Sequence, residues 1–260
     1  MLTLEAQKII NNQINVGKMN TQITLEKLQG LKLNGMAKVY QTILSLPIQD
    51  QPTVNQLIAR LVEAEIQERS NKKTEMFLRL SKLRYNAVIE QVYCSVERNF
   101  SKDSLILLSD CSFIDRADNI LITGATGSGK SYLACAIGRQ ACILGYKTMY
   151  LGMNRLIENI NQSKIDGTYM KLINQFEKTH LIIIDDFGLQ PLDAIIRIAL
   201  LQILEDRYGK KSVIVTSQLP IAKWYEYIGD DTLADAIMDR MAVNANKIEL
   251  NSKFSLRNKM

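Results

Sequence analysis

One octet of the sequence has the residue types and spacing of a phosphate-binding loop. Residues Gly124 to Ser131 read Gly-Ala-Thr-Gly-Ser-Gly-Lys-Ser and match the P-loop pattern G-x-x-x-x-G-K-[ST]. Because Gly127 and Gly129 lack Cβ atoms, the backbone can turn sharply and bring its N–H groups close to phosphate oxygens. We expect Lys130 to reach the β- and γ-phosphates and the Ser131 hydroxyl to bind Mg²⁺. The predicted nucleotide-binding residues are Gly124, Ala125, Thr126, Gly127, Ser128, Gly129, Lys130 and Ser131.

Two carboxylates follow a second apolar run. Leu181 to Ile184 are typical of a strand buried on both faces, and Asp185 and Asp186 come directly after them. In a P-loop enzyme we expect Asp185 to hold Mg²⁺ through a water molecule or alongside Ser131. Asp186 is then placed to orient or polarise an attacking water molecule. The pair therefore favours hydrolysis of the triphosphate over simple binding.

Three later polar residues are further candidates for this chemistry. Gln218 follows the apolar run Val213 to Thr216, and a strand lying between the P-loop strand and the acidic strand would place its amide near the γ-phosphate. Arg240 and Arg257 are late basic residues outside the P-loop core. An arginine from a neighbouring subunit can stabilise the transition-state charge of phosphoryl transfer, but spacing alone supports this only weakly, because most helix arginines are surface residues.

The elements that must position these residues alternate along the chain. We expect strands at 119–123, 147–151, 181–184, 212–216 and 247–250, with helices at 131–144, 195–207 and between the other strands. Strands that alternate with helices predict a three-layer α/β/α fold around a parallel sheet, with ligands at the carboxyl ends of the strands. The octet and the acidic pair both lie at such ends.

The region before the octet has a helical pattern from Thr24 to about Tyr93, broken at Pro47. It contains a basic stretch with six candidate DNA contacts: Arg69, Lys72, Lys73, Arg79, Lys82 and Arg84. This stretch reads either as a solvated helix surface or as a surface that contacts a phosphate backbone. The net charge of +5 permits nucleic-acid contact without requiring it.

Composition excludes several other classes of protein. No stretch reaches the length of apolar sequence that a membrane span needs, and the first residues lack the pattern of a secretory signal. The four cysteines show no C-x-x-C pairing, and the single histidine, His180, has no visible ligand partners. We therefore expect a reduced, cytoplasmic protein with no structural metal and no membrane partner.

The ordered set of motifs resembles the IstB-like transposition helper ATPases of bacterial insertion sequences. These are a branch of the AAA+ ATPases close to the DnaC-type helicase loaders. The resemblance runs from about Leu28 to Arg257. Besides the octet, its markers are Leu31-Lys32-Leu33-Asn34-Gly35-Met36-Ala37, Ile184-Asp185-Asp186-Phe187-Gly188-Leu189, Leu204-Glu205-Asp206-Arg207-Tyr208-Gly209, Thr216-Ser217-Gln218-Leu219-Pro220 with Trp224, and Thr232-Leu233-Ala234-Asp235-Ala236-Ile237-Met238-Asp239-Arg240.

The resemblance implies roles beyond those that spacing indicates. It makes Gln218 the γ-phosphate sensor, Arg240 an arginine finger acting in trans, and Arg257 a sensor-two-like nucleotide contact. With Lys130 and Asp186, Gln218 and Arg240 complete the predicted catalytic set. The cofactors would be ATP and Mg²⁺. The protein would assemble into homo-oligomers on duplex DNA and recruit or activate its cognate transposase.

The residue pattern divides the chain into four parts, and the resemblance gives the helical part its role. We expect a flexible extension over residues 1–22, a helical domain for DNA engagement and assembly over 23–93, a connector over 94–118 and an AAA+ ATPase domain over 119–260. The principal alternative is a DnaC-like replicative helicase loader, which would bind a helicase and single-stranded DNA. A small-molecule kinase explains neither Asp186 nor Arg240.

Overall fold

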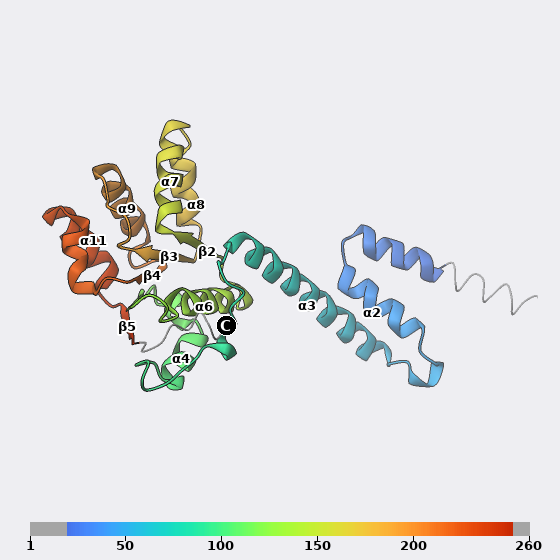
Figure 1. Cartoon of the computed structure of the whole chain (residues 1–260). Coiled ribbons are helices and arrows are strands. Elements are labelled where there is room, and N and C mark those ends of the chain that lie inside the picture. Colours follow the sequence, from blue (N-terminus) through green and yellow to red (C-terminus); the bar gives the residue numbers. More distant parts are fainter. Residues whose placement is uncertain (1–19, 252–260) are drawn as a thin grey trace, which may run out of the picture. The chain divides into compact units, whose positions relative to one another are not determined.

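The structure is a computed structural model of the whole chain and describes residues 20–251. It divides into two compact units, residues 1–73 and residues 74–260, and helix α3 (Val54–Ser81) runs across the division (Figure 1). Most of the expected 1–22 extension, and Arg257, lie outside the described residues. Among the described residues, no helix is both long and apolar enough to cross a bilayer.

All regular secondary structure in the described part of the first unit is helical. It contains a helix over residues 20–30, α2 (Asn34–Leu44), a short 3₁₀ turn η1 (Ile48–Asp50) and the first part of α3. Helices α2 and α3 approach so closely that a Cβ on Gly35 would lie 2.3 Å from the Ala64 carbonyl oxygen. At this contact the Glu65 carboxylate accepts the backbone N–H of Gly35 at 2.9 Å, so a side chain of α3 satisfies the first turn of α2.

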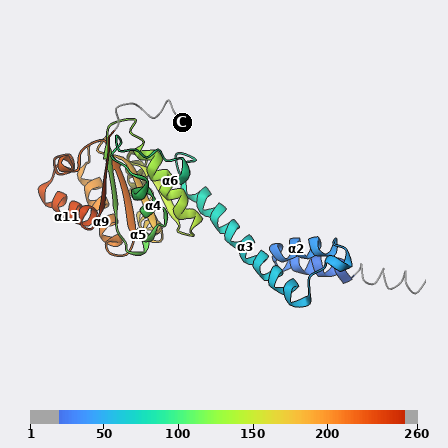
Figure 2. The same cartoon turned by 90° about the horizontal axis from the view of Figure 1, so that it is seen from below.

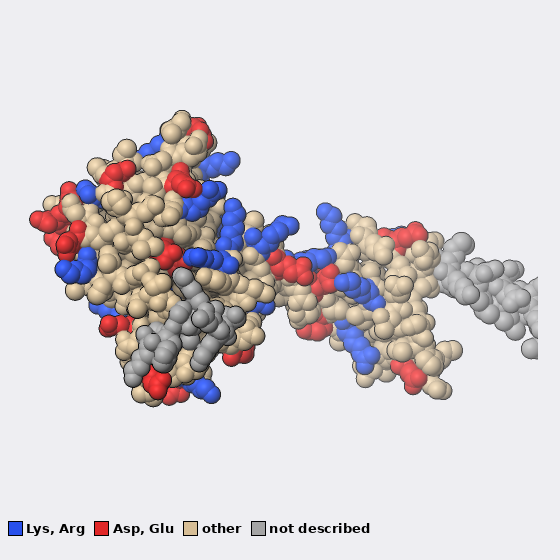
Figure 3. Space-filling model, viewed as in Figure 1, with Lys and Arg blue, Asp and Glu red and all other residues tan. Residues whose placement is uncertain are grey.

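Basic and acidic side chains are mixed along α3, as Figure 3 shows. Arg69 pairs with Glu65 at 2.8 Å and Lys72 pairs with Glu68 at 3.1 Å, both at helical i, i+4 spacing. The hydrogen bond from Arg69 is the largest cause of a lowered pKa at Glu65. Two of the six predicted DNA contacts are therefore already engaged with carboxylates of their own helix.

The second unit is built on a five-stranded parallel sheet in the order β2-β3-β4-β1-β5. Its strands are β1 (Ile120–Gly124), β2 (Thr148–Gly152), β3 (Leu181–Phe187), β4 (Ser212–Ser217) and β5 (Asn246–Leu250). This confirms the predicted parallel α/β fold, and four of the five strands begin and end within one residue of the expected positions. Strand β4 lies between β1 and β3, as the hypothesis about Gln218 required.

Strand β3 is longer than the sequence pattern predicted. It runs through both carboxylates to Phe187, which pairs with Ser217 across an irregularity in the ladder. Phe187 is buried against the ring of Trp224, with ring centroids 4.9 Å apart. This apolar contact holds the chain in the sheet beyond the point where two acidic residues suggest that it should leave.

Helices cover both faces of the sheet, because alternate strand residues bury apolar side chains on opposite sides. Ile120, Ile122 and Ile183 face a core with α6 (Lys130–Ile143), α4 (Lys102–Ser109) and α5 (Ser112–Asp115). Figure 2 shows these three helices together. The opposite core holds α7 (Met153–Ile165), α8 (Tyr169–Glu177), α9 (Ala194–Arg207), α10 (Trp224–Ile228) and α11 (Asp231–Ala242).

The structural division differs from the domain boundaries predicted from sequence. Helix α3 ends at Ser81, whereas the helical pattern extended to about Tyr93, and after α3 only one 3₁₀ turn, η2 (Ile89–Gln91), precedes α4. Residues 94–118, expected to be a connector, contribute α4, α5 and the buried Phe113 to the core beneath β1. These segments pack on the sheet, so they belong to the second unit.

Candidate nucleotide-binding site

The predicted P-loop joins the end of β1 to the start of α6, as its pattern requires. Gly124 has a φ of +146°, and a Cβ there would lie 2.3 Å from the Leu250 carbonyl oxygen of β5, so this position needs glycine. Gly127 and Gly129 have φ of +81° and +85°, in the left-handed region that side chains disfavour. The glycines thus fix the course of the loop between two strands and a helix.

The first turn of α6 is left open for an anion. Gly129 is the N-cap residue and supplies no side-chain cap, so the first N–H groups of α6 are not satisfied by a capping side chain. Lys130 is buried, and its Nζ donates to the Gly124 and Ala125 carbonyl oxygens at 2.7 and 2.9 Å. The ammonium group is therefore held inside the loop, where it would meet phosphate oxygens.

Arg98 holds the backbone of the P-loop by hydrogen bonds, and the sequence analysis did not predict this residue. Its Nε and Nη2 donate to the Ser128 carbonyl oxygen at 3.1 and 2.9 Å, while Nη1 donates to the Tyr93 carbonyl oxygen. Because the two ends of a planar trans peptide point in opposite directions, this contact turns the Gly129 N–H away from Arg98. Burial lowers the pKa of Arg98. No motif in the sequence singles out this residue.

Asp185 sits at the centre of a set of hydroxyl donors and is fully buried. Its carboxylate accepts from Ser131 Oγ at 2.8 Å, and also from Thr216 of β4 and Tyr150 of β2. Both flanking strands thus direct a hydroxyl group at the carboxylate between them. Burial, followed by the hydrogen bond to Asp185, raises the pKa of Tyr150, which therefore stays a neutral donor.

Asp186 has a backbone conformation that is rare for residues other than glycine. Its φ is +61°, a conformation that costs roughly 1–3 kcal/mol unless the surrounding structure imposes it. The irregular pairing between Ile184 and Phe187 accommodates it, and Thr216 Oγ1 accepts the Asp186 N–H at 3.2 Å. The side chain of Asp186, about one-third exposed, lines the same pocket as the P-loop.

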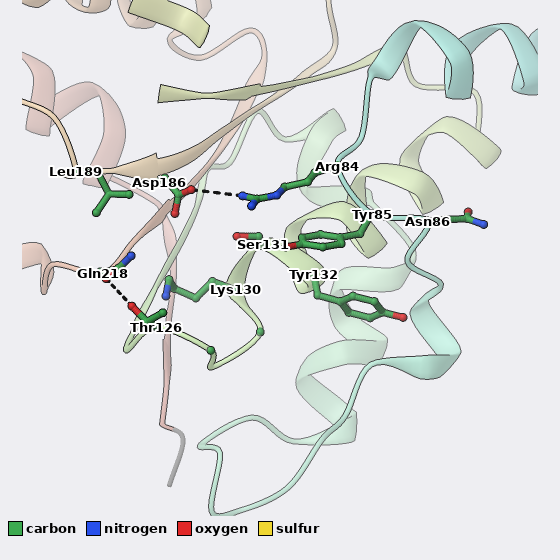
Figure 4. Close-up of a pocket in the computed structure, with 12 residues that line it drawn as sticks. Arg84, Tyr85, Asn86, Thr126, Lys130, Ser131, Tyr132, Asp186, Leu189 and Gln218 are labelled. Atoms are coloured by element: carbon green, nitrogen blue, oxygen red, sulfur yellow. Dashed lines mark hydrogen bonds and ion pairs between the residues drawn. The ribbon is translucent and has the colours of Figure 1, made fainter. Parts of the chain in front are cut away.

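A pocket of about 410 Å³ brings these predicted residues together, as Figure 4 shows. Gln218 lines it, and Gln218 Oε1 accepts a hydrogen bond from Thr126 Oγ1 at 2.7 Å, which links the end of β4 to the P-loop. The predicted residues on its wall are Thr126, Gly127, Gly129, Lys130, Ser131, Asp186 and Gln218. A volume of this size is ordinary for a small-ligand site.

Five residues of the pocket were not predicted as nucleotide contacts: Arg84, Tyr85, Asn86, Tyr132 and Leu189. The first three lie a few residues after the end of α3 at Ser81. The rings of Tyr85 and Tyr132 lie 6.2 Å apart, centroid to centroid. Tyr132 could have been predicted as a pocket residue, because it comes directly after the octet in the sequence. The run Arg84 to Asn86 carries no local sign that it folds back over the P-loop.

The oxygen donors beside the loop suit a magnesium ion. Ser131 Oγ and Asp185 offer hard oxygen ligands 2.8 Å apart, and Mg²⁺ is usually held by one or two such protein groups together with nucleotide phosphates. No cluster of three or more His, Cys, Asp or Glu that could hold a metal occurs within residues 20–251. The two oxygen donors are therefore of the kind that fits Mg²⁺.

Arg240 is not brought to this pocket. Asn119, which precedes β1, donates to the Arg240 carbonyl oxygen at 2.9 Å, whereas the P-loop leaves the other end of the same five-residue strand. The guanidinium of Arg240 pairs with Glu205 at 2.6 Å and lies over the Tyr208 ring. By the usual rise per residue, about 16 Å of strand separates the two edges.

Five of the six basic residues predicted to contact DNA fall into three different surroundings. Arg69 and Lys72 pair with glutamates, and Arg84 lines the nucleotide pocket. Arg79 and Lys82 line a separate hollow together with Arg139. The structure therefore separates a set that the sequence had grouped by charge alone.

Comparison with known proteins identifies the family. A profile described as IstB-like ATP binding protein matches residues 26–260. The y4pL insertion sequence ATP-binding protein of Sinorhizobium fredii is 40% identical over 235 residues, which cover 90% of this chain and 96% of that protein. The ATP-binding protein of insertion sequence IS1162 from Pseudomonas fluorescens is 35% identical, over 78% of this chain and 88% of its own length.

Solved structures agree with the fold. The DnaC helicase loader superposes with a TM-score of 0.53 and 18% identity, covering 65% of this chain and 99% of its own. The replication initiator DnaA bound to AMPPCP and single-stranded DNA gives a TM-score of 0.55 and 19% identity, over 68% of this chain and 54% of its own. At these identities the likeness concerns the AAA+ fold alone. The family profile spans both the P-loop and the acidic pair. The chain therefore belongs to the IstB-like ATP-binding protein family.

Proposed function

We propose that this chain is a Mg²⁺-dependent ATPase that assembles on duplex DNA and recruits or activates the transposase of its insertion sequence. The observation that carries the proposal is the division of the catalytic groups between two edges of one sheet. Lys130, Asp186 and Gln218 lie in the pocket, while Arg240 lies at the opposite edge. A finger arginine in that place would have to serve a second copy of the chain.

Hydrolysis is supported by the environment of each carboxylate. Asp185 is buried among three hydroxyl donors and is suited to hold a cation that neutralises phosphate charge. Asp186 remains partly exposed in the pocket, where its oxygens can accept a proton from a water molecule in line with the γ-phosphate. Gln218 is tied to Thr126 and would orient that water or the γ-phosphate.

DNA binding is supported by charge and by the names of relatives. Arg79, Lys82 and Arg139 line one hollow whose other lining residues include no carboxylate, so the charged side chains on its wall are all basic. The two relatives described above are named for insertion sequences, which favours transposition as the setting. The fold likeness to the DnaC loader keeps a helicase loader as the alternative.

The test is ATP hydrolysis by the purified chain with and without duplex DNA, coupled to particle size with ATP, ADP or no nucleotide. We expect larger particles with ATP, and faster hydrolysis with duplex DNA that weakens as salt rises. A protein that stays monomeric with ATP and ignores DNA would contradict the proposal. Stimulation by single-stranded DNA alone, with binding to a replicative helicase and none to the transposase, would establish the alternative.

A further inference from the structure

Arg84 belongs to the nucleotide pocket rather than to a DNA-binding surface. Its Nη1 lies 3.5 Å from Asp186 Oδ2 and 3.8 Å from Asp185 Oδ2, and half of its side chain is exposed (Figure 4). Both separations are longer than the hydrogen-bond distances of a close, bidentate arginine–carboxylate pair. The guanidinium therefore neutralises the acidic pair loosely, and the side chain lines the pocket while half of it stays exposed.

The surroundings of Arg84 mark the triphosphate end of the pocket. If ATP and Mg²⁺ bind here, Ser131 and Asp185 would hold the ion, and Asp186 and Gln218 would lie beside the γ-phosphate. Because Arg84 lies against both carboxylates, a γ-phosphate bound there would come within reach of its guanidinium. The planar fork of an arginine matches phosphate oxygens as well as carboxylate oxygens.

The backbone holds Arg84 in this place. Leu83, immediately before it, packs against the core beneath the sheet, and Ala87, three residues later, is fully buried in that core. The guanidinium also lies over the Tyr85 ring, 5.4 Å from its centroid. The side chain can therefore change partners by rotating, while its Cα stays fixed.

We propose that Arg84 is an arginine acting in cis on the γ-phosphate, which exchanges its ion pair with Asp186 for that phosphate when ATP binds. The exchange would let the pocket distinguish ATP from ADP and would release Asp186 for a water molecule. The proposal rests on the proposed function only in taking ATP with Mg²⁺ as the ligand of this pocket.

The first experiment measures binding of ATP and ADP, each with Mg²⁺, to the full chain and its variants by a fluorescent-nucleotide titration. For Arg84→Gln we expect ATP affinity to fall about tenfold, as for loss of one charge-assisted contact, while ADP affinity changes less than about twofold. Arg84→Lys keeps the charge but loses the fork, so its ATP affinity should lie between the two. Equal losses for ATP and ADP, no loss, or tighter ATP binding would each overturn the proposal.

A matched control removes a similar charge away from the pocket. Arg155 is exposed on α7, pairs with Glu158 at 3.1 Å and does not line the pocket. Arg155→Gln should leave both nucleotide affinities unchanged. A fall in ATP affinity equal to that of Arg84→Gln would show that net charge, rather than position, is responsible, and would overturn the proposal.

The exchange itself is tested by a double-mutant cycle with Asp186→Asn. If Arg84 must leave Asp186 to reach the phosphate, part of its contribution to ATP affinity is spent on breaking that ion pair. Removing the carboxylate charge should therefore increase the contribution of Arg84 to ATP affinity. The loss caused by Arg84→Gln should therefore be larger in the Asp186→Asn background than in the wild type. Equal or smaller losses would overturn the exchange, because simple repulsion between Asp186 and the phosphate is independent of Arg84.

The two proposals fail in different ways. If the wild-type chain bound neither nucleotide, the proposed function would fail. If the wild type bound and hydrolysed ATP but Arg84→Gln kept its preference for ATP over ADP, only the role of Arg84 would fail. Thermal unfolding of each variant checks that the half-exposed substitution leaves the fold intact.

Discussion

The two edges of the parallel sheet differ in what they can do alone. The carboxyl edge carries the P-loop, the buried Asp185 and the strained Asp186 in one pocket. The amino edge carries Arg240, paired with Glu205 and anchored through Asn119. The carboxyl edge has the groups suited to bind a triphosphate. The amino edge has an arginine that lies too far from the pocket of its own chain to reach a nucleotide there.

The difference separates binding from turnover. Binding needs groups that adjoin one loop, so a single chain supplies them. Under the proposed function, stabilising the transition state calls for a further cation, and Arg240 lies at the far end of the strand that leads to the loop. The two proposals thus give the two arginines different steps: Arg84, which lies in the pocket, would recognise ATP, and Arg240, which does not, would act on hydrolysis in a neighbouring subunit.

The largest effect is expected from Lys130→Ala. Removing the buried ammonium group takes away the cation inside the loop, so nucleotide binding should fall below detection, and hydrolysis and ATP-dependent assembly should disappear with it. The measurement is a nucleotide titration with thermal unfolding as the control for folding. Binding close to that of the wild type would show that the carboxyl edge does not work as described.

Arg240→Ala should remove the function proposed for the amino edge and leave nucleotide binding at the carboxyl edge intact. Nucleotide affinity should stay within about twofold, while hydrolysis in the assembled form should fall about a thousandfold, the usual scale for a lost arginine finger. Mixing this variant with Lys130→Ala should restore part of the activity, because each variant supplies what the other lacks. Absence of rescue, together with an equal loss in dilute monomer, would argue against action in trans.

Asp186→Asn should separate binding from turnover within the carboxyl edge. An amide at this position cannot accept the proton of the attacking water, so hydrolysis should fall at least about a hundredfold. ATP binding and ATP-dependent particle size should persist. Steady-state phosphate release measures the first, and light scattering measures the second. Normal turnover would refute the assigned role.

The smallest effect is expected from Glu205→Gln. The pair with Arg240 is partly exposed, and such pairs contribute only about 0–1 kcal/mol. Hydrolysis in the assembled form should therefore change by no more than about fivefold, with nucleotide affinity unchanged. Comparing the Arg240 variant with this one tells whether the amino edge needs the arginine itself or also its partner. A loss as large as that of Arg240→Ala would show that Glu205 fixes the finger.

The local parts of the site were predictable because their signals are contiguous. The octet specifies a strand, a glycine-rich turn and a helix start within a few residues, and the structure has these at β1, Gly124–Ser131 and α6. The buried strand before Asp185 was equally clear. Its continuation to Phe187 was not, because it depends on the contact with Trp224, thirty-seven positions further along the chain by the printed sequence.

The groups that surround the carboxylates could not be read from the sequence. Tyr150 and Thr216 reach Asp185 only because β2 and β4 flank β3, and strand order is a property of the whole sheet. Arg84 looked like one more cation in a basic helix. Its place follows from the end of α3 at Ser81 and from the packing of Leu83 and Ala87.

By itself, the sequence determined that residues Gly124–Ser131 form a P-loop between a strand and a helix and that an acidic pair follows a buried apolar run. Both follow from short-range rules of backbone geometry and periodicity. Only the tertiary structure decided which cation shares the pocket, since Arg84 and Arg240 carry the same charge and differ in where long-range packing leaves them. The physical reason is that electrostatic and hydrogen-bonding chemistry acts over a few ångströms of space, whatever the separation along the chain.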